Sequence, residues 1–139
     1  MRTLLLTSVL LSACSNDPVG RSTLPSGGFH YTAMSPAGTP VLTGRIRLAF
    51  PDDSTITGTW TIAWLPGADT TTPVGPQVGT GDLFGSRSGD ALWIQLNPHN
   101  ADHNVGLRAL ATTAGYTGEW EWVTFTGPHS RGSFAARAE

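Results

Sequence analysis

The chain has 139 residues, a formal net charge of −2 and only arginine among its eight basic side chains. This length suits one domain with a substantial core, and the slightly acidic balance argues against the clustered basic surface that binds nucleic acid. With one cysteine in the chain no intramolecular disulfide can form, so packing alone must stabilise the fold.

The first fourteen residues combine a positive start, a short apolar run and small residues at its exit. Arg2 supplies the charge, residues 4–11 form the run, and Leu11-Ser12-Ala13-Cys14 closes it. The run is too short to span a bilayer, so the pattern predicts an export signal. Its closing residues resemble the lipobox of bacterial lipoproteins, which implies cleavage before Cys14 and lipid attached to that cysteine. An ordinary secretory signal with an incidental cysteine is the alternative.

The lipoprotein resemblance implies a cell-envelope protein that is held at a membrane by lipid on Cys14. Because Ser15 follows the cysteine, the resemblance implies the outer membrane if the host is Gram-negative. We expect residues 1–13 to be the signal peptide, residues 14–28 the lipidated cysteine with a flexible tether rich in Pro, Gly and Ser, and residues 29–139 the domain. No later stretch approaches the roughly 20 apolar residues of a transmembrane helix.

From residue 29 onward, apolar and polar side chains alternate as they do in half-buried strands. The clearest run is 55–65, which places Ile56, Trp60 and Ile62 on one face and threonines on the other. The pattern predicts eight strands, near residues 29–34, 45–50, 55–65, 78–86, 92–96, 105–111, 116–122 and 133–137. Two connections are long, 66–77 and 98–103, and no segment has a helical period.

Eight sequential strands joined mostly by short loops predict an all-β fold, an eight-stranded antiparallel up-and-down barrel. A two-sheet β-sandwich is the alternative. The segment Ile56-Thr57-Gly58-Thr59-Trp60 is similar to a strand of the calycin barrels, the group of lipocalins and avidins. The resemblance implies a small barrel over residues 29–138. It implies no biotin or retinoid ligand, since neither a biotin-site residue set nor the glycine–tryptophan opening of lipocalins is present.

A short motif recurs three times in the chain. It reads Leu42-Thr43-Gly44, Ile56-Thr57-Gly58 and Tyr116-Thr117-Gly118, each two residues before an isoleucine or tryptophan on a predicted inward face. A glycine there makes room for a large side chain across the sheet or lets the strand bend. We therefore interpret the recurring motif as a feature that serves packing of the barrel.

Five aromatic side chains fall on predicted inward faces and are the candidate ligand-binding residues. They are Trp60, Trp64, Trp120, Trp122 and Phe134, whereas Trp93 falls on the opposite face from its neighbours Leu92 and Ile94. An eight-stranded barrel is just wide enough to be filled by its own side chains or to hold one small ligand. Tryptophans suit both, because they bury a large area and offer an indole N–H donor.

Two histidines and a carboxylate lie close together in the sequence and are weak candidates for metal ligands. His99, Asp102 and His103 carry donors that suit zinc or copper. However, this histidine spacing brings both rings to one face only in a helix, and the run contains Pro98 and several asparagines. A solvated loop is the favoured interpretation, and we expect no metal and no other cofactor.

Catalytic chemistry is not indicated. Glu119 and Glu121 share an outward strand face, roughly 7 Å apart by strand geometry. A catalytic carboxylate pair lies in a cleft with one member desolvated, whereas these two are the polar half of an alternating strand. Serine-nucleophile and phosphate-loop motifs, which need a following helix, are absent. We therefore expect a protein that is not an enzyme.

Two functional hypotheses remain. The first is a non-catalytic binding module that takes a small, partly apolar ligand into a tryptophan-lined barrel. It requires an internal void of roughly 300 Å³ or more near Trp60 and Trp120. The second is a structural or protein-interaction lipoprotein of the envelope, in which that space is filled and an exposed apolar patch meets a partner.

Overall fold

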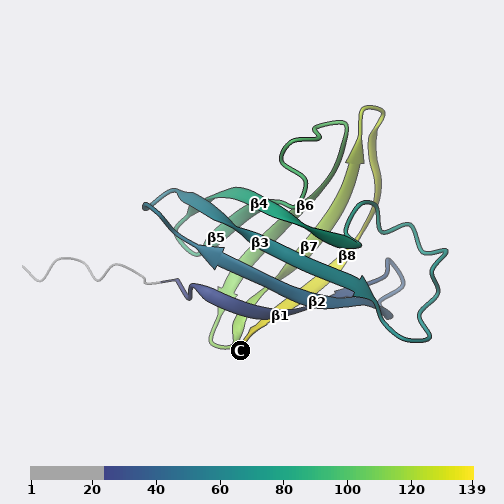
Figure 1. Ribbon diagram of the computed structural model, residues 1–139, viewed down its shortest axis with the longest axis horizontal. Helices are drawn as coiled ribbons and strands as arrows, with labels where there is room; N and C mark the ends of the chain where they lie inside the picture. Colours follow the sequence, from purple (N-terminus) through teal and green to yellow (C-terminus); the bar gives the residue numbers. More distant parts are fainter. Residues whose placement is uncertain (1–23) are drawn as a thin grey trace, which may run out of the picture.

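The computed structural model describes residues 24–139, and all of the regular structure in this part of the chain is β-strand (Figure 1). The strands are β1 (Gly27–Met34), β2 (Pro40–Ala49), β3 (Thr55–Trp64), β4 (Gly79–Ser88), β5 (Ala91–Gln95), β6 (His103–Thr112), β7 (Gly115–Thr124) and β8 (Gly127–Ala138). Each pairs antiparallel with the next, and β1 pairs with β8 to close the barrel. The predicted up-and-down barrel is confirmed, and the sandwich is excluded. No helix among residues 24–139 is long and apolar enough to cross a membrane.

The barrel takes in more of the chain than the sequence pattern indicates. β8 starts at Gly127 instead of residue 133. Its polar first half lacks an apolar alternation but still pairs with β7, with a register shift between Trp122 and Val123. The resulting β7–β8 hairpin projects beyond the neighbouring strands (Figure 1). At the other end, β1 starts at Gly27 and Leu24 is buried, so the barrel begins two residues before position 29 and packs against the segment that precedes it.

The predicted alternation of inward and outward side chains is confirmed along the strands. In β3, Ile56, Trp60 and Ile62 are buried, whereas Thr59 and Thr61 are exposed. The same period holds in β6, where Val105 and its inward neighbours form part of one continuous core. Each large apolar side chain buried in this way stabilises the fold by roughly 1.5–3 kcal/mol.

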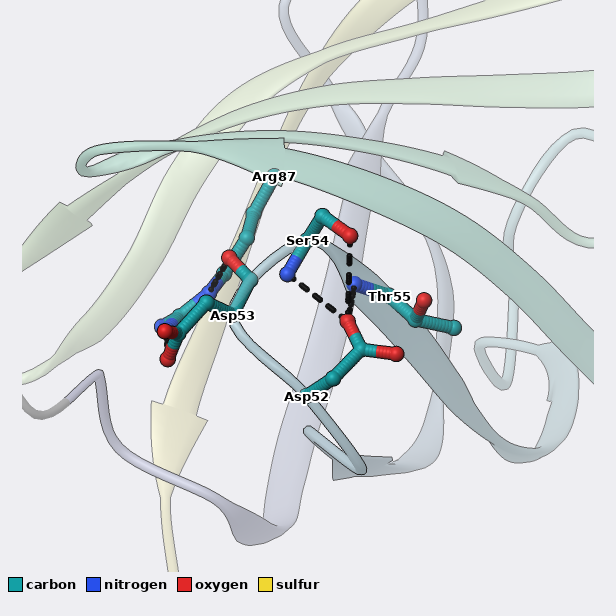
Figure 2. A network of polar contacts seen from close by, with 5 residues as sticks. All are labelled: Asp52, Asp53, Ser54, Thr55 and Arg87. Carbon is teal, nitrogen blue, oxygen red and sulfur yellow. Dashed lines mark hydrogen bonds and ion pairs between the residues drawn. The ribbon is translucent and has the colours of Figure 1, made fainter.

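One end of the barrel, which we call the turn end, carries the short β2–β3, β4–β5 and β6–β7 connections and both ends of the described chain. Figure 2 shows how the β2–β3 turn is held there. The Asp52 carboxylate accepts hydrogen bonds from the backbone N–H groups of Ser54 and Thr55 at 2.8 and 2.7 Å, which lower the pKa of Asp52 to about 2. Arg87 Nε donates to the Asp53 carbonyl oxygen at 2.8 Å, and its guanidinium packs on the Phe50 ring.

The opposite end, the loop end, is closed by the β3–β4 loop, residues 65–78. This loop inserts Val74 and Gln77 into the barrel mouth, where both are buried. The Tyr31 hydroxyl donates to Gln77 Oε1 at 2.8 Å, and Gln77 Nε2 donates to the Val74 carbonyl oxygen at 2.7 Å. Further along, Ser130 Oγ donates to the Pro73 carbonyl oxygen. The loop is thus bonded to the barrel wall from more than one strand.

Burial of both tyrosines makes the fold sensitive to alkaline pH. The chain has two tyrosines, Tyr31 in the core and Tyr116, whose hydroxyl donates to the Pro25 carbonyl oxygen at 2.7 Å. Desolvation raises the pKa of Tyr116 from 10.0 to about 12 and raises the pKa of Tyr31 further. Because the unfolded phenols ionise first, we expect stability to be fully present below pH 10 and to fall as the pH rises towards 12.

Tyrosinate absorbance and circular dichroism, followed together against pH, test this expectation. The tyrosinate signal should appear with the loss of the β-sheet spectrum, whereas the chain in denaturant should titrate near the ordinary phenol pKa of about 10. Ionisation of both phenols near that pKa in an intact barrel would contradict it.

Candidate functional site

The interior tryptophans and Phe134 are packed into the core. Trp120 is 0% exposed, Trp60 and Phe134 are each 4% exposed, and Tyr31, which stacks on Phe134, is 0% exposed. Trp60 Nε1 donates to the Leu96 carbonyl oxygen at 2.7 Å, and Trp120 Nε1 donates to the Met34 carbonyl oxygen at 2.9 Å. Both indole donors are therefore satisfied by backbone.

This packing bears on the void that an internal ligand would need. A side chain that lines a ligand-sized void presents surface to it, yet neither Trp120 nor Tyr31 presents any. Phe29 lies edge-on against Tyr116, with ring centroids 5.2 Å apart, and fills the space nearer the turn end. The geometry around Trp120 thus favours the filled barrel of the second hypothesis.

The structure places Trp64 and Trp122 at the loop end, half-buried, and not in the barrel centre. Trp122 Nε1 donates to His103 Nδ1 at 3.3 Å, and the His129 ring stacks on the indole at 4.8 Å between centroids. A Cβ added to Gly75 would overlap the Trp122 ring, so this glycine of the β3–β4 loop lies directly against the indole. Trp122 therefore supports the loop that closes the barrel.

The metal candidates do not form a cluster. His99 and Asp102 lie in the loop between β5 and β6, and His103 begins β6 and accepts the Trp122 hydrogen bond. Within residues 24–139, no three His, Cys, Asp or Glu side chains are grouped so that they could hold a metal ion. Glu119 and Glu121 lie on the outward face of β7, opposite Arg108 and Gly106 of β6. Cys14 lies outside the described residues.

A groove on the outer wall is a candidate site that the sequence pattern did not single out. It runs over β4 to β7, has a volume of about 560 Å³, and is lined mainly by apolar atoms. We call it the outer groove, and its main wall residues are Ser86, Ala91, Trp93, Arg108, Leu110 and Glu119. Trp93, Arg108 and Glu119 stand side by side in one row across β5, β6 and β7.

Gly106 shapes this groove. A Cβ at Gly106 would come within 3.0 Å of the Trp93 ring, so the indole lies over the glycine, on the outer surface of β6. Leu110, in the neighbouring row opposite Ala91, is 60% exposed. The sequence did show that Trp93 is out of phase with its apolar neighbours. It could not show the glycine beneath the ring, because Gly106 lies on another strand.

The two arginines of the groove differ in their partners. Arg87 is engaged by Asp53, through the carbonyl oxygen and an ion pair of 3.5 Å. Arg108 instead lies over the Trp93 ring, with its guanidinium carbon 5.0 Å from the ring centroid. Within residues 24–139, no ion pair joins Arg108 to an acidic side chain, although Glu119 stands opposite it.

A second hollow, of about 760 Å³, lies at the loop end between the β1–β2 and β3–β4 loops. Its walls are rich in proline, and its carboxylate, Asp69, accepts hydrogen bonds from Thr71 within the same loop. The hollow therefore offers less directed chemistry than the outer groove.

Comparison with protein-family models, curated proteins and solved structures finds no match to this chain, so its function must be inferred from its own geometry.

Proposed function

We propose that this chain is a lipid-anchored, non-catalytic binding protein of the cell envelope that works through the outer wall of a packed barrel. The observation that carries the proposal is the interior, where the Trp60 and Trp120 indole donors are bonded to backbone and Trp120 is fully enclosed. The outer groove supplies the exposed apolar surface that the second hypothesis requires.

The lipobox supports the anchored part of the proposal. Leu11-Ser12-Ala13-Cys14 ends in the one cysteine of the chain. Stable attachment needs more than one acyl chain, since a single chain binds membranes weakly and reversibly.

Lipidation is tested by expressing the full chain in a bacterial host with labelled palmitate. We expect the wild-type protein to incorporate label and to fractionate with membranes, and Cys14→Ser to do neither. Ser15→Ala, which changes the next residue, is the matched control and should behave as the wild type does. A wild-type chain that carries no label would contradict the anchor.

The role of the outer wall is tested with a photoreactive side chain placed in the intact envelope protein. Placed at Leu110, it should yield a reproducible adduct of defined mass. Placed at Thr59, an exposed outward position on β3, it should not. Equal adducts at both positions would contradict the proposal. So would a copurifying ligand that stays bound whichever groove residue is substituted.

A further inference from the structure

We propose that the outer groove binds small molecules that join an apolar body to a carboxylate. The apolar body lies on Trp93 and Leu110, and the carboxylate is bound by Arg108. The inference rests on the proposed function in one respect, namely that the outer wall is the working surface of the barrel.

The apolar part of the ligand follows from the shape and lining of the groove. Its volume of about 560 Å³ falls within the range of small-molecule sites, about 300–1,000 Å³. Trp93 provides a rigid aromatic surface, fixed by its position over Gly106. Leu110 is 60% exposed, so a ligand that covers it removes apolar surface from water. At the groove, β4 pairs with β5, β5 with β6 and β6 with β7, so recognition there uses side chains of this kind.

The negative charge of the ligand follows from Arg108. A guanidinium that stacks on an aromatic ring uses its face and leaves the N–H donors at its edge available. These donors match the two oxygens of a carboxylate, and the resulting charge-assisted bonds are stronger than neutral ones. Arg87 is already engaged by Asp53, so Arg108 is the arginine of the groove that can take an added anion.

Glu119 sets a limit on the charge of the ligand. Its carboxylate lines the groove opposite Arg108, so it repels an anion and attracts a cation. A compact, singly charged carboxylate can bind the N–H donors at the edge of the Arg108 guanidinium, whose face lies over the Trp93 ring. Removal of the Glu119 charge should therefore tighten binding of the proposed ligand, whereas it would weaken binding of a cationic or zwitterionic one.

The test uses 3-phenylpropanoate as the probe, with the matched alcohol and amine, 3-phenylpropanol and 3-phenylpropylammonium. Binding is measured by calorimetry on the full lipidated protein in nanodiscs, and empty nanodiscs correct for partition into lipid. We expect the carboxylate to bind at least about tenfold more tightly than the alcohol, because a hydrogen bond to a charged group contributes that much binding free energy. The amine should bind no better than the alcohol.

Four variants locate the probe. Arg108→Gln should weaken binding of the carboxylate by about tenfold and leave binding of the alcohol unchanged. Glu119→Gln should tighten binding of the carboxylate by roughly two- to fivefold. Leu110→Ser should weaken both probes. Arg131→Gln is the matched control, because Arg131 lies opposite Glu121 on the same wall and outside the groove lining. All four side chains are partly or fully exposed, so the variants should fold.

Equal binding of acid and alcohol, or full binding by Arg108→Gln, would overturn the inference. If the protein prefers the amine and loses that preference in Glu119→Gln, the groove is a cation site and the inference is wrong. If no probe binds while Leu110 still cross-links to a protein, the outer wall is the working surface but its partner is macromolecular. In that case this inference fails and the proposed function stands.

Discussion

Replacement of Trp120 with alanine should lower the free energy of unfolding by about 3–5 kcal/mol, the range for large aromatic-to-alanine changes in cores. The indole is fully enclosed, and its Nε1 bonds the Met34 carbonyl oxygen. Gly132 is shaped to it, since a Cβ there would approach Trp120 Nε1 to 2.7 Å. Because domains of this size are stable by only about 5–15 kcal/mol, the change should remove a large share of the total stability.

Urea denaturation followed by circular dichroism measures this effect. Trp93→Ala is the matched control, because that ring lies on the outer wall, and its loss should cost only about 1 kcal/mol. Trp120→Phe should fall between them, since it keeps most of the buried ring but leaves the Met34 carbonyl oxygen without its donor. If Trp120→Ala were as stable as the wild type, the interior would tolerate a hole, and a hollow, ligand-binding barrel would have to be reconsidered.

The second large effect is expected from Gly58→Ala. A Cβ at Gly58 would overlap the carbonyl oxygen of Arg47 on β2, which is backbone and cannot rotate away. Overpacking of a core ordinarily costs about 1–3 kcal/mol, and a clash with backbone in a closed barrel should reach or exceed the upper end. We therefore expect the yield of soluble, folded protein to fall sharply in Gly58→Ala.

The control for this change is Thr59→Ala, at the next position of the same strand. Thr59 points outward and is exposed, so its loss should change stability by less than about 0.5 kcal/mol. Thermal unfolding of the two variants beside the wild type gives the comparison. A Gly58→Ala barrel with an unchanged melting temperature would show that β2 and β3 can separate without cost.

The Gly58 argument also explains the recurring threonine–glycine motif. The sequence left open whether its glycines accommodate a large side chain or a bend. At Gly44, Gly58 and Gly118, the neighbour that a Cβ would meet is backbone of the adjacent strand, so these glycines permit close approach of two strands. Gly81 makes room for the Trp60 ring, and Gly132 serves both purposes, because a Cβ there would meet the Met34 carbonyl oxygen as well as the Trp120 ring.

The candidate site was predictable only in part. Alternation correctly assigned Trp60 and Trp120 to the inside and Trp93 to the outside. It could not decide whether the inside is hollow, because the barrel mouth is closed by Gln77 from a loop without any periodic pattern, bonded to Tyr31 far earlier in the chain. The outer groove was not predictable, because Trp93 and Gly106 meet only through the pairing of β5 with β6.

Local alternation of side chains was enough to predict the number of strands, the all-β class and the inward or outward face of most residues within the predicted strands. These properties depend on residues one or two positions apart, whose alternation is set by the strand geometry. The closure of the barrel, in which Phe29 pairs with Ala138, and the placement of Arg108 over Trp93 arise only from the folded chain. Such contacts depend on register between distant segments, which no local pattern of side chains specifies.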